Sequence, residues 1–382
     1  MASRPSLLYI APVIPMLTGN GLAMRAGAVL EAVARWCDVD LLVARLYPPF
    51  LPAVPEPFAG LCRRTAVVSQ WSPPRDPQAR RPWLGSHYDL VHVFRLAALP
   101  FSRPYLGGLF RRPRRHLDLD DLESLTRRRL AALYRSNGHH DLAAREEAEA
   151  ACSEPLEAEA LRRFDRVYVC SAHDRRLLES RGRARAELCV LPNAVRRPPP
   201  VPAPPAEGPF RFLFVGTLGY YPNEDAVRYL CCEIVPRLRE LAGARFAVTI
   251  AGAGAPKSLE QAAGVPQIQF LGEVPDLHPL YAQAHAILAP LRAGGGTRIK
   301  VLEAFSYRRP VIATPAAIEG IEARPEEHVL IGDTAAAIAR QAARLIAAPE
   351  LCETLARNAA ALFERRYTIE ALASLLAGCE RR

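Results

Sequence analysis

Three glycines precede two cationic side chains in the stretch GGGTRIKVLEAF, residues 294–305. The pattern predicts the start of a helix with Thr297 as its N-cap and with Arg298 and Lys300 in the first turn. A helix dipole disfavours positive charge there, so a bound anion would offset the cost. The unpaired N–H groups of a first turn point at such an anion. A pyrophosphate site is therefore predicted at Gly294, Gly295, Gly296, Thr297, Arg298 and Lys300. A solvated helix start with two surface cations is the alternative.

Glu303 lies one turn further along, three residues after Lys300. A carboxylate beside a pyrophosphate would be repelled unless it bound a neutral group, such as the diol of a ribose. The alternative is an intrahelical ion pair between Glu303 and Lys300, which is a common and weak feature. The residues alone leave both interpretations open.

The elements that would position these side chains alternate along the whole chain. Amphipathic patterns predict helices over residues 25–36, 225–241, 300–307 and 335–347. Apolar runs predict strands over residues 6–12, 38–44, 89–94, 115–119, 166–171 and 187–193 in the first half, and over 210–216, 246–252, 268–274, 284–291, 310–314 and 328–332 in the second. Strands that alternate with helices indicate parallel sheets covered on both faces. The fold class predicted is α/β, with two doubly wound Rossmann-like domains.

A proline-rich stretch divides the two halves. Residues 196–209, RRPPPVPAPPAEGP, cannot form a helix or a central strand and predict an extended linker. We expect domains over residues 1–197 and 210–365, a linker over 198–209, and a C-terminal helix over 366–382 that packs back on the first domain. Sheets of this kind bind ligands beyond the carboxyl ends of their strands, so the site is expected in the cleft between the domains.

Composition is typical of a soluble globular protein. Of the 382 residues, 50% are apolar and 23% charged, without a run of 18 apolar residues. The apolar start, residues 7–17, suits a buried strand better than a signal peptide. The nine cysteines have no metal-ligand spacing. We interpret them as reduced, mostly core thiols, which favours a cytoplasmic location.

The second half resembles the C-terminal domain of family 4 glycosyltransferases of the GT-B fold. The resemblance rests on VGTLGYYPNEDAVRYL, on GGGTRIKVLEAFSYRRPVIAT with IEGI after it, and on ERRYTIEALASLL. The first half resembles the family less specifically, through the loop from Gly19 to Arg25 and through DLVHV, VYVCSAHDRRLL and LCVLPNAV. The resemblance implies a retaining transferase with two domains that face a central cleft. It implies a nucleotide diphosphate sugar as donor, held by the C-terminal domain, an acceptor held by the N-terminal domain, and no required metal or other cofactor.

The resemblance also implies roles for particular residues. The equivalent of Glu303 binds the donor ribose in relatives, and cations near Arg298 and Lys300 face the diphosphate. Many relatives carry a further Glu near the transferred sugar, where this chain has Gly295, and an Arg after the Phe-Val-Gly strand, where Thr217 follows Gly216. The diphosphate contacts are therefore expected to shift onto Arg298, Lys300 and backbone N–H groups. Glu319, in AAIEGI, is the candidate for the missing sugar contact, with a loop or helix cap as the alternative.

On the acceptor side, the stretch HLDLDDLES, residues 116–124, ends a predicted strand in aspartates. Relatives often have a His near the reacting centre here, and Asp120 would take its place as the residue that orients the acceptor hydroxyl. The alternative is that Asp120, Asp121 and Glu123 cap the next helix. Asp118 and Asp120 also match the Asp-x-Asp of metal-dependent GT-A enzymes, but the two-domain layout argues against that fold.

Further candidates are expected around the acceptor. The loop Gly19-Asn20-Gly21 with Arg25 is a candidate lid. His92, at the carboxyl end of a predicted strand, could face the cleft, with a core histidine as the alternative.

The whole excess of positive charge lies in the first half of the chain. Residues 1–206 carry 30 arginines against 21 acidic residues, which gives +9, whereas residues 207–382 carry 19 of each sign. The basic segments RRPRR (111–115) and TRRRL (126–130) flank the aspartate stretch. We expect a possible contact with the anionic inner face of a membrane, beside the entrance for a glycan or lipid-linked acceptor.

Other classes of function stay open. They are a nucleotide-sugar epimerase of the same fold, a basic nucleic-acid binder, which lacks aromatic interleaving, and a scaffold that has lost activity. The function predicted is glycosyl transfer in the assembly of cell-surface polysaccharide or glycolipid. This pathway rests on the family resemblance alone.

Overall fold

The computed structural model describes residues 4–68, 82–107, 112–182, 184–262 and 264–380. The chain forms two compact units, which we describe separately. Unit 1 comprises Met1–Arg128, Ala144–Ala194 and Ile369–Arg382. Unit 2 comprises Arg129–Ala143 and Val195–Thr368. The chain therefore passes between the units four times, twice within the helices α3 (Glu123–Ser136) and α4 (His140–Arg163).

Unit 1 is built on a seven-stranded parallel sheet in the order β3-β2-β1-β4-β5-β6-β7. Its strands are β1 (Ser6–Ala11), β2 (Asp38–Ala44), β3 (Arg64–Val68), β4 (Leu90–Phe94), β5 (Arg114–Asp120), β6 (Arg166–Val169) and β7 (Glu187–Val190). Its helices, besides parts of α3 and α4, are α1 (Gly21–Val33), α2 (Leu99–Ser102), α5 (Ala172–Ser180) and α14 (Ile369–Glu380), with short 3-10 turns η1 (Ala59–Leu61), η3 (Leu96–Ala98) and η4 (Arg103–Tyr105).

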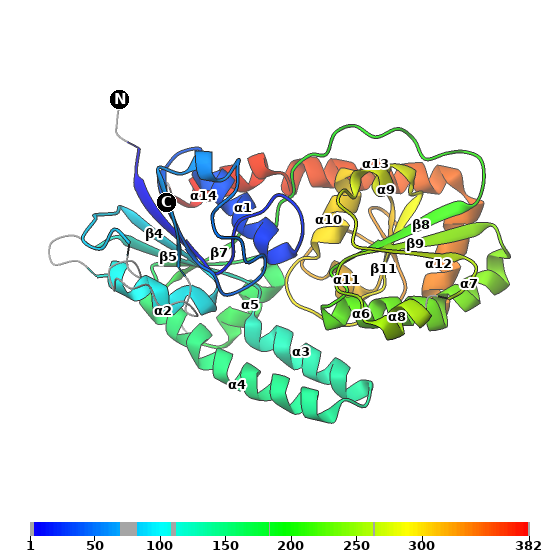
Figure 1. Ribbon diagram of the computed structural model, residues 1–382, viewed down its shortest axis with the longest axis horizontal. Helices are drawn as coiled ribbons and strands as arrows, with labels where there is room; N and C mark the ends of the chain where they lie inside the picture. The colour runs from blue at the N-terminus through cyan, green and yellow to red at the C-terminus, as the bar shows by residue number, and fades with distance from the viewer. Residues whose placement is uncertain (1–3, 69–81, 108–111, 183, 263, 381–382) are drawn as a thin grey trace. The chain divides into compact units, whose positions relative to one another are not determined.

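Strand side chains of unit 1 alternate between two cores. Leu7 and Tyr9 belong to one buried cluster, and Leu8 and Ile10 belong to the other. This two-residue period is the geometry of a strand buried on both faces. Helix α14, from the end of the chain, packs beside α1 on the first cluster (Figure 1).

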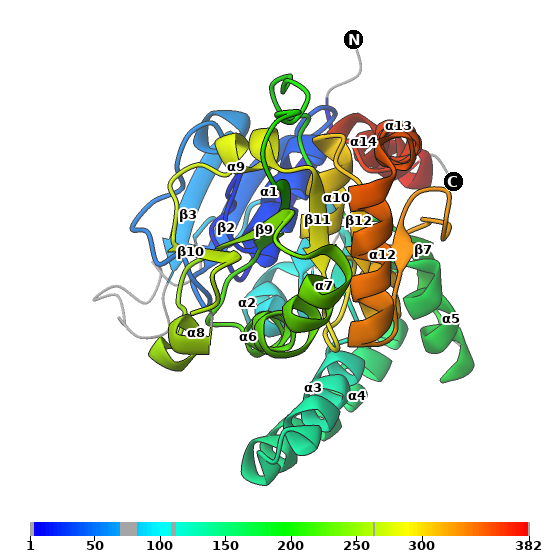
Figure 2. The ribbon, with the colours of Figure 1, turned by 90° about the vertical axis from the view of Figure 1, so that its right-hand side faces the viewer.

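Unit 2 is built on a six-stranded parallel sheet in the order β10-β9-β8-β11-β12-β13. Its strands are β8 (Phe210–Val215), β9 (Phe246–Ala251), β10 (Ile268–Gly272), β11 (Ala286–Ala289), β12 (Val311–Ala313) and β13 (Leu330–Ile331). Its helices are α6 (Tyr221–Tyr229), α7 (Val235–Ala242), α8 (Lys257–Ala262), α9 (His278–Gln283), α10 (Ile299–Ser306), α11 (Pro315–Ile318), α12 (Ala335–Ala347) and α13 (Pro349–Arg366). Helices α7 and α12 lie side by side (Figure 2).

The prediction of two doubly wound parallel sheets is confirmed, and all twelve predicted strands are present. The strand β3 was missed, because it is a short edge strand that begins with arginine and buries only Val68 fully. The helix predicted over residues 225–241 runs from Tyr221 to Ala242 and contains one π-helical turn, η5 (Leu230–Ile234).

The proline-rich stretch 196–209 has no helix or strand. Two side chains of unit 2 hold it, since Arg309 donates to the carbonyl of Pro202 (3.0 Å) and His285 lies 2.9 Å from the carbonyl oxygen of Pro205. All nine cysteines are free, and four of them, Cys37, Cys170, Cys189 and Cys231, are buried. Cys62, Cys352 and Cys379 are partly buried and pack against the hydrophobic cores, so the expectation that most of the cysteines are core thiols is confirmed. Among the described residues, no helix combines the length and apolar character needed to cross a membrane.

Candidate active site

The glycine stretch of unit 2 joins β11 to α10. Gly294 and Gly296 have φ angles of 130° and 63°, which other residues rarely adopt. The N-cap of α10 is Arg298, without a side-chain capping bond. The prediction that Thr297 caps this helix is therefore wrong. Thr297 is buried one residue before the cap.

The Arg298 side chain turns back onto its own loop. Its guanidinium donates to the carbonyl oxygens of Gly295, Gly296 (2.6 Å) and Ala316 (3.2 Å). The positive charge of Arg298 at the start of a helix is thus partly offset within the loop, because carbonyl dipoles surround the guanidinium. Arg298 is 9% exposed, and its contacts fix the shape of the loop.

Lys300 lies in the first turn of α10 and reaches toward the end of β8. Its ammonium donates to Oδ1 of Asn223 (2.7 Å) and lies 4.3 Å from the centre of the Phe214 ring. Gly216 leaves the space for it, since a Cβ atom there would come within 2.8 Å of the lysine Nζ. Burial lowers the pKa of Lys300 to about 7, and Arg298 adds to the fall, while Glu303 opposes it.

Glu303 is held by an aromatic partner. The hydroxyl of Tyr281 donates to its Oε2 (3.2 Å), and the Tyr281 ring stacks on Tyr307 with centroids 4.3 Å apart. Burial raises the pKa of Glu303 to about 7, while the Tyr281 hydrogen bond and Lys300 oppose the rise. Among the described residues, no ion pair joins Glu303 to Lys300, so that alternative is wrong. Each side chain therefore has its own partner, Asn223 for Lys300 and Tyr281 for Glu303.

Glu319 follows α11 as its C-cap residue. Its carboxylate accepts two hydrogen bonds from Arg129 (2.6 and 3.0 Å), which also donates to the carbonyl of Gly294 (3.3 Å). Arg129 belongs to the same compact unit as Glu319 and the glycine stretch. The carboxylate predicted to contact the sugar is thus committed to an ion pair that steadies the loop.

In unit 1, the aspartates of β5 surround a buried arginine. Arg25 donates to Asp118 through Nη2 (2.8 Å) and Nε (3.1 Å), and to Oδ1 of Asn193 (3.0 Å). The side chains of Arg25 and Asp118 are 1% and 0% exposed. Arg25 lies inside α1, which begins at Gly21, so the expectation of a loop that reaches Arg25 is wrong.

Asp120 ends β5 beside this pair, at a shift in strand register. Its φ angle is 64°, and its Oδ1 lies 3.4 Å from the Nε of Arg25. Burial raises the pKa of the Asp120 carboxyl to about 6; Arg25 opposes the rise, and Asp121 adds to it. The helix α3 begins after Asp121, whose Oδ2 accepts from Thr126 (2.6 Å), while Asp120 contacts Arg25 and Asn193 instead.

Two other predicted side chains lie elsewhere. His92 is in the middle of β4, 1% exposed, with its ring stacked on Tyr168 (centroids 5.6 Å apart). Burial lowers its pKa to about 4, so it is a neutral core residue. Asn20 is the N-cap of α1 and accepts from the N–H of Ala23 (2.9 Å), while Gly19 before it is exposed with a φ angle of 107°.

The basic segments are mostly compensated. Arg115 pairs with Asp165 (2.9 Å), Arg127 with Glu123 (3.2 Å) and Glu146 (3.0 Å), and Arg128 with Glu154. Arg111 lies outside the described residues. Arg112 and Arg114 are exposed, so the contact of these segments with an anionic membrane stays a prediction.

Sequence reasoning missed several side chains of these clusters. Asn223, Tyr281 and Phe214 surround Lys300 and Glu303, yet they come from α6, α9 and β8. No spacing links these positions, so only the fold brings them together. Within the described residues, no three His, Cys, Asp or Glu side chains gather closely enough to hold a metal ion.

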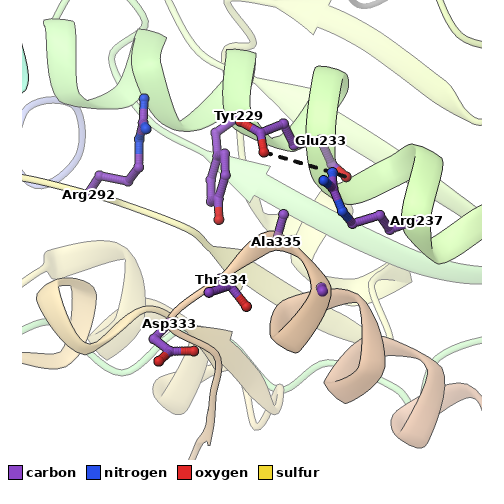
Figure 3. Close-up of a pocket in the computed structure, with 8 residues that line it drawn as sticks. Tyr229, Glu233, Arg237, Arg292, Asp333, Thr334 and Ala335 are labelled. Carbon is purple, nitrogen blue, oxygen red and sulfur yellow. Dashed lines mark hydrogen bonds and ion pairs between the residues drawn. The ribbon is translucent and has the colours of Figure 1, made fainter. Parts of the chain in front are cut away.

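A cavity of about 410 Å³ opens elsewhere in unit 2, between η5 and the start of α12 (Figure 3). Its lining includes Tyr229, Glu233, Arg237, Arg292, Asp333 and Thr334. None of the predicted donor residues lines it. Its cations are already engaged: Arg292 pairs with Asp225, and Arg237 lies 3.8 Å from Glu233. We therefore locate the candidate site by chemistry, at α10, rather than by volume.

Comparison with known proteins gives the fold of the chain and a family match for a segment of unit 2. Residues 209–348 match the family described as "Glycosyl transferases group 1". No curated protein sequence matches the chain. Among solved structures, sucrose-phosphate synthase from Thermosynechococcus elongatus is 17% identical with a TM-score of 0.73, over 99% of this chain and 98% of that one.

Two further structures share the fold over nearly all of both chains. HepE of Anabaena, in complex with UDP-glucose, is 14% identical with a TM-score of 0.68, over 99% of each chain. The lipopolysaccharide outer core galactosyltransferase WaaB is 13% identical with a TM-score of 0.60, over 98% of this chain and 99% of that one. The family match and the two parallel Rossmann-like sheets confirm the resemblance found in the sequence. The chain has the α/β GT-B fold of two parallel Rossmann-like sheets, and residues 209–348 are similar to group 1 glycosyl transferases.

Proposed function

We propose that the chain is a retaining glycosyltransferase that moves a sugar from a nucleotide diphosphate sugar to a hydroxyl of a glycan or lipid-linked acceptor. The pathway we propose is the assembly of cell-surface polysaccharide or glycolipid, in the cytoplasm. One observation carries the proposal: a half-buried lysine with a lowered pKa and a carboxylate held by a tyrosine lie on α10, inside the segment that matches the family. HepE in its UDP-glucose complex and the galactosyltransferase WaaB supply the analogy for donor and pathway.

On the donor side, Lys300 and the first N–H groups of α10 are proposed to hold the diphosphate. A bound diphosphate would supply the anion that Lys300 lacks and would raise the charged fraction of its amine. Glu303 would accept hydrogen bonds from the ribose diol. Gly216 and Thr217 would lie along the nucleotide, and Arg298 would keep the loop in shape. Cations and N–H groups would then stabilise the negative charge of the diphosphate, so the proposal includes no metal or other cofactor.

On the acceptor side, Asp120 is proposed to orient the attacking hydroxyl. As the bond from the sugar to the donor phosphate breaks, the acceptor oxygen bonds to the same face of the sugar, and the proton of the acceptor hydroxyl passes to the departing phosphate oxygen. A carboxyl with a pKa near 6 is ionised at neutral pH and can accept a hydrogen bond from that hydroxyl. Asp118, which is paired with Arg25, supports the loop, and the exposed Gly19 with the half-buried Asn20 remains a candidate lid. No nucleic acid partner is proposed.

Incubation of the purified protein with a panel of radiolabelled nucleotide sugars, with and without a lipid and glycan extract, tests the function. We expect label to move to the extract from one donor, with retention of anomeric configuration. Asp120→Asn should lower transfer at least tenfold, whereas Asp141→Asn, at an exposed aspartate, should not. Isomerisation of the donor without any acceptor would favour an epimerase, and the absence of both reactions across the panel would contradict the proposal.

Lys300→Met should weaken binding of UDP, used here as a probe, by about one to two decades, because a charge-assisted phosphate contact contributes roughly 1.5–3 kcal/mol. In the protein without UDP, the pKa of Lys300 is about 7. The protein should therefore take up most of one proton when it binds UDP at pH 8, and its affinity for UDP should fall as the pH rises from 6.5 to 8.5. Calorimetry in buffers of different ionisation enthalpy measures this uptake. The control is Lys257→Met, at the only other lysine, which is exposed. A wild-type protein that takes up no proton would contradict this role for Lys300.

Glu303→Gln should weaken binding of UDP but leave binding of inorganic pyrophosphate nearly unchanged, because only UDP presents a ribose diol. Tyr281→Phe should produce a smaller loss, since the tyrosine only orients the carboxylate. Glu240→Gln, at an exposed position of α7, is the control. Calorimetry with both ligands checks the prediction, and equal losses for UDP and pyrophosphate would count against a ribose contact.

A further inference from the structure

Arg95 stands immediately after β4 in a backbone conformation that suits glycine. Its φ and ψ angles are 68° and 151°, a region almost restricted to glycine. Asp120, at the end of the adjacent strand β5, also has a positive φ angle, 64°. The two strands are paired through Phe94 and Asp118, and the N–H of Arg95 donates to the carbonyl of Asp118 (2.7 Å). Two strained residues thus lie at the carboxyl ends of neighbouring central strands.

The Arg95 side chain explains why a glycine is not used there. Its Nη1 donates to the carbonyl of Leu119 (2.9 Å) and to Asp121, and lies 3.7 Å from Oδ2 of Asp120. Its Nη2 lies 3.9 Å from Glu123. The side chain is 16% exposed, so these contacts are shielded from water. A glycine would relieve the backbone and lose all of them.

Polar and charged side chains lie near both carboxylate oxygens of Asp120. Arg25 and the amide of Asn193 each lie 3.4 Å from Oδ1, while Arg95 approaches Oδ2. We propose that Arg95 is a positioning residue that holds Asp120 in a single orientation toward the acceptor hydroxyl, and that its glycine-type backbone is retained for this purpose. The proposal rests on the proposed function of Asp120 and extends it to a residue that no motif indicated.

The charges around Asp120 give this contact a measurable signature. The groups that act on its titration are all in unit 1: Tyr9 of β1, Arg25 of α1, Arg95 after β4, Asp118 of β5, Asp121 before α3, and Cys170 after β6. Burial, Asp121 and Asp118 raise the pKa of Asp120, and Arg25 and Arg95 lower it. Removing the Arg95 charge should therefore raise that pKa further. The acid limb of the activity, which requires the ionised carboxylate, should move to higher pH with it.

The test compares Arg95→Gly, Arg95→Met and Arg95→Lys with the wild type. The titration of the Asp120 carboxyl carbon is followed by NMR with 13C-labelled aspartate, and its signal is assigned by its loss in Asp120→Asn. The glycine and methionine variants should raise the midpoint of the Asp120 titration by about one pH unit, because an opposite charge within about 4–6 Å shifts a pKa by that order. Lysine should keep the midpoint near that of the wild type. The pH profile of transfer should shift in the same way, with kcat about tenfold lower for glycine and methionine and KM for the donor unchanged.

The matched control is Arg308→Gly, which relieves a positive φ angle of 56° at an exposed arginine of unit 2 and should leave the Asp120 titration unchanged. If Arg95→Gly does not fold, Arg95→Met carries the comparison, since it keeps the β-carbon and removes the guanidinium with its charge and its hydrogen bonds. A midpoint that is the same in the wild type, the methionine variant and the lysine variant would overturn the proposal. A wild-type protein without transferase activity would refute the proposed function, while the NMR titration would still decide whether Arg95 acts on Asp120.

Discussion

A cation enclosed without a carboxylate partner determines the chemistry of unit 2. Among the described residues, no carboxylate lies within ion-pair distance of Lys300, and its contacts are an amide oxygen and an aromatic face. A buried charge of this kind is unfavourable unless an anion completes it, and the fall of the lysine pKa to about 7 expresses that cost. Gly216, Asn223 and the loop shaped by Arg298 all serve to keep the ammonium in this position. A ligand with a diphosphate would complete the site at the helix terminus that also provides N–H donors.

Unit 1 shows the opposite situation, a concentration of negative charge. Asp118 is compensated completely by Arg25, and both are inaccessible to water. Such a buried pair contributes little net stability, but the loss of either member would leave the other charge uncompensated, at a cost of roughly 3–5 kcal/mol. This pair lies beside Asp120, whose pKa burial raises to about 6, so that its carboxyl is about half ionised at pH 6. The proposed roles differ accordingly: unit 2 is proposed to bind phosphate, and unit 1 is proposed to accept a hydrogen bond from the acceptor hydroxyl.

Much of this could be predicted from the sequence, because apolar periodicity determines which segments become buried strands. The edge strand β3 was not predicted because it buries only one side chain fully. The start of α1 was not predicted because its first residue, Gly21, is typical of a loop, although Asn20 caps the helix there. Lys300 and Glu303 were found because they share one helical turn. Their partners Asn223 and Tyr281 were not, since they come from distant helices. Arg95 carried no signal at all, because its distinguishing property is a backbone angle.

The most direct test of this account is a crystal structure of the protein with bound UDP. The account predicts ribose hydroxyls within about 3.2 Å of the Glu303 carboxylate, and diphosphate oxygens beside the Lys300 ammonium and the first N–H groups of α10. Nucleotide density in the cavity lined by Tyr229 and Arg237, with Lys300 bound only to Asn223 and Glu303 only to Tyr281, would contradict it.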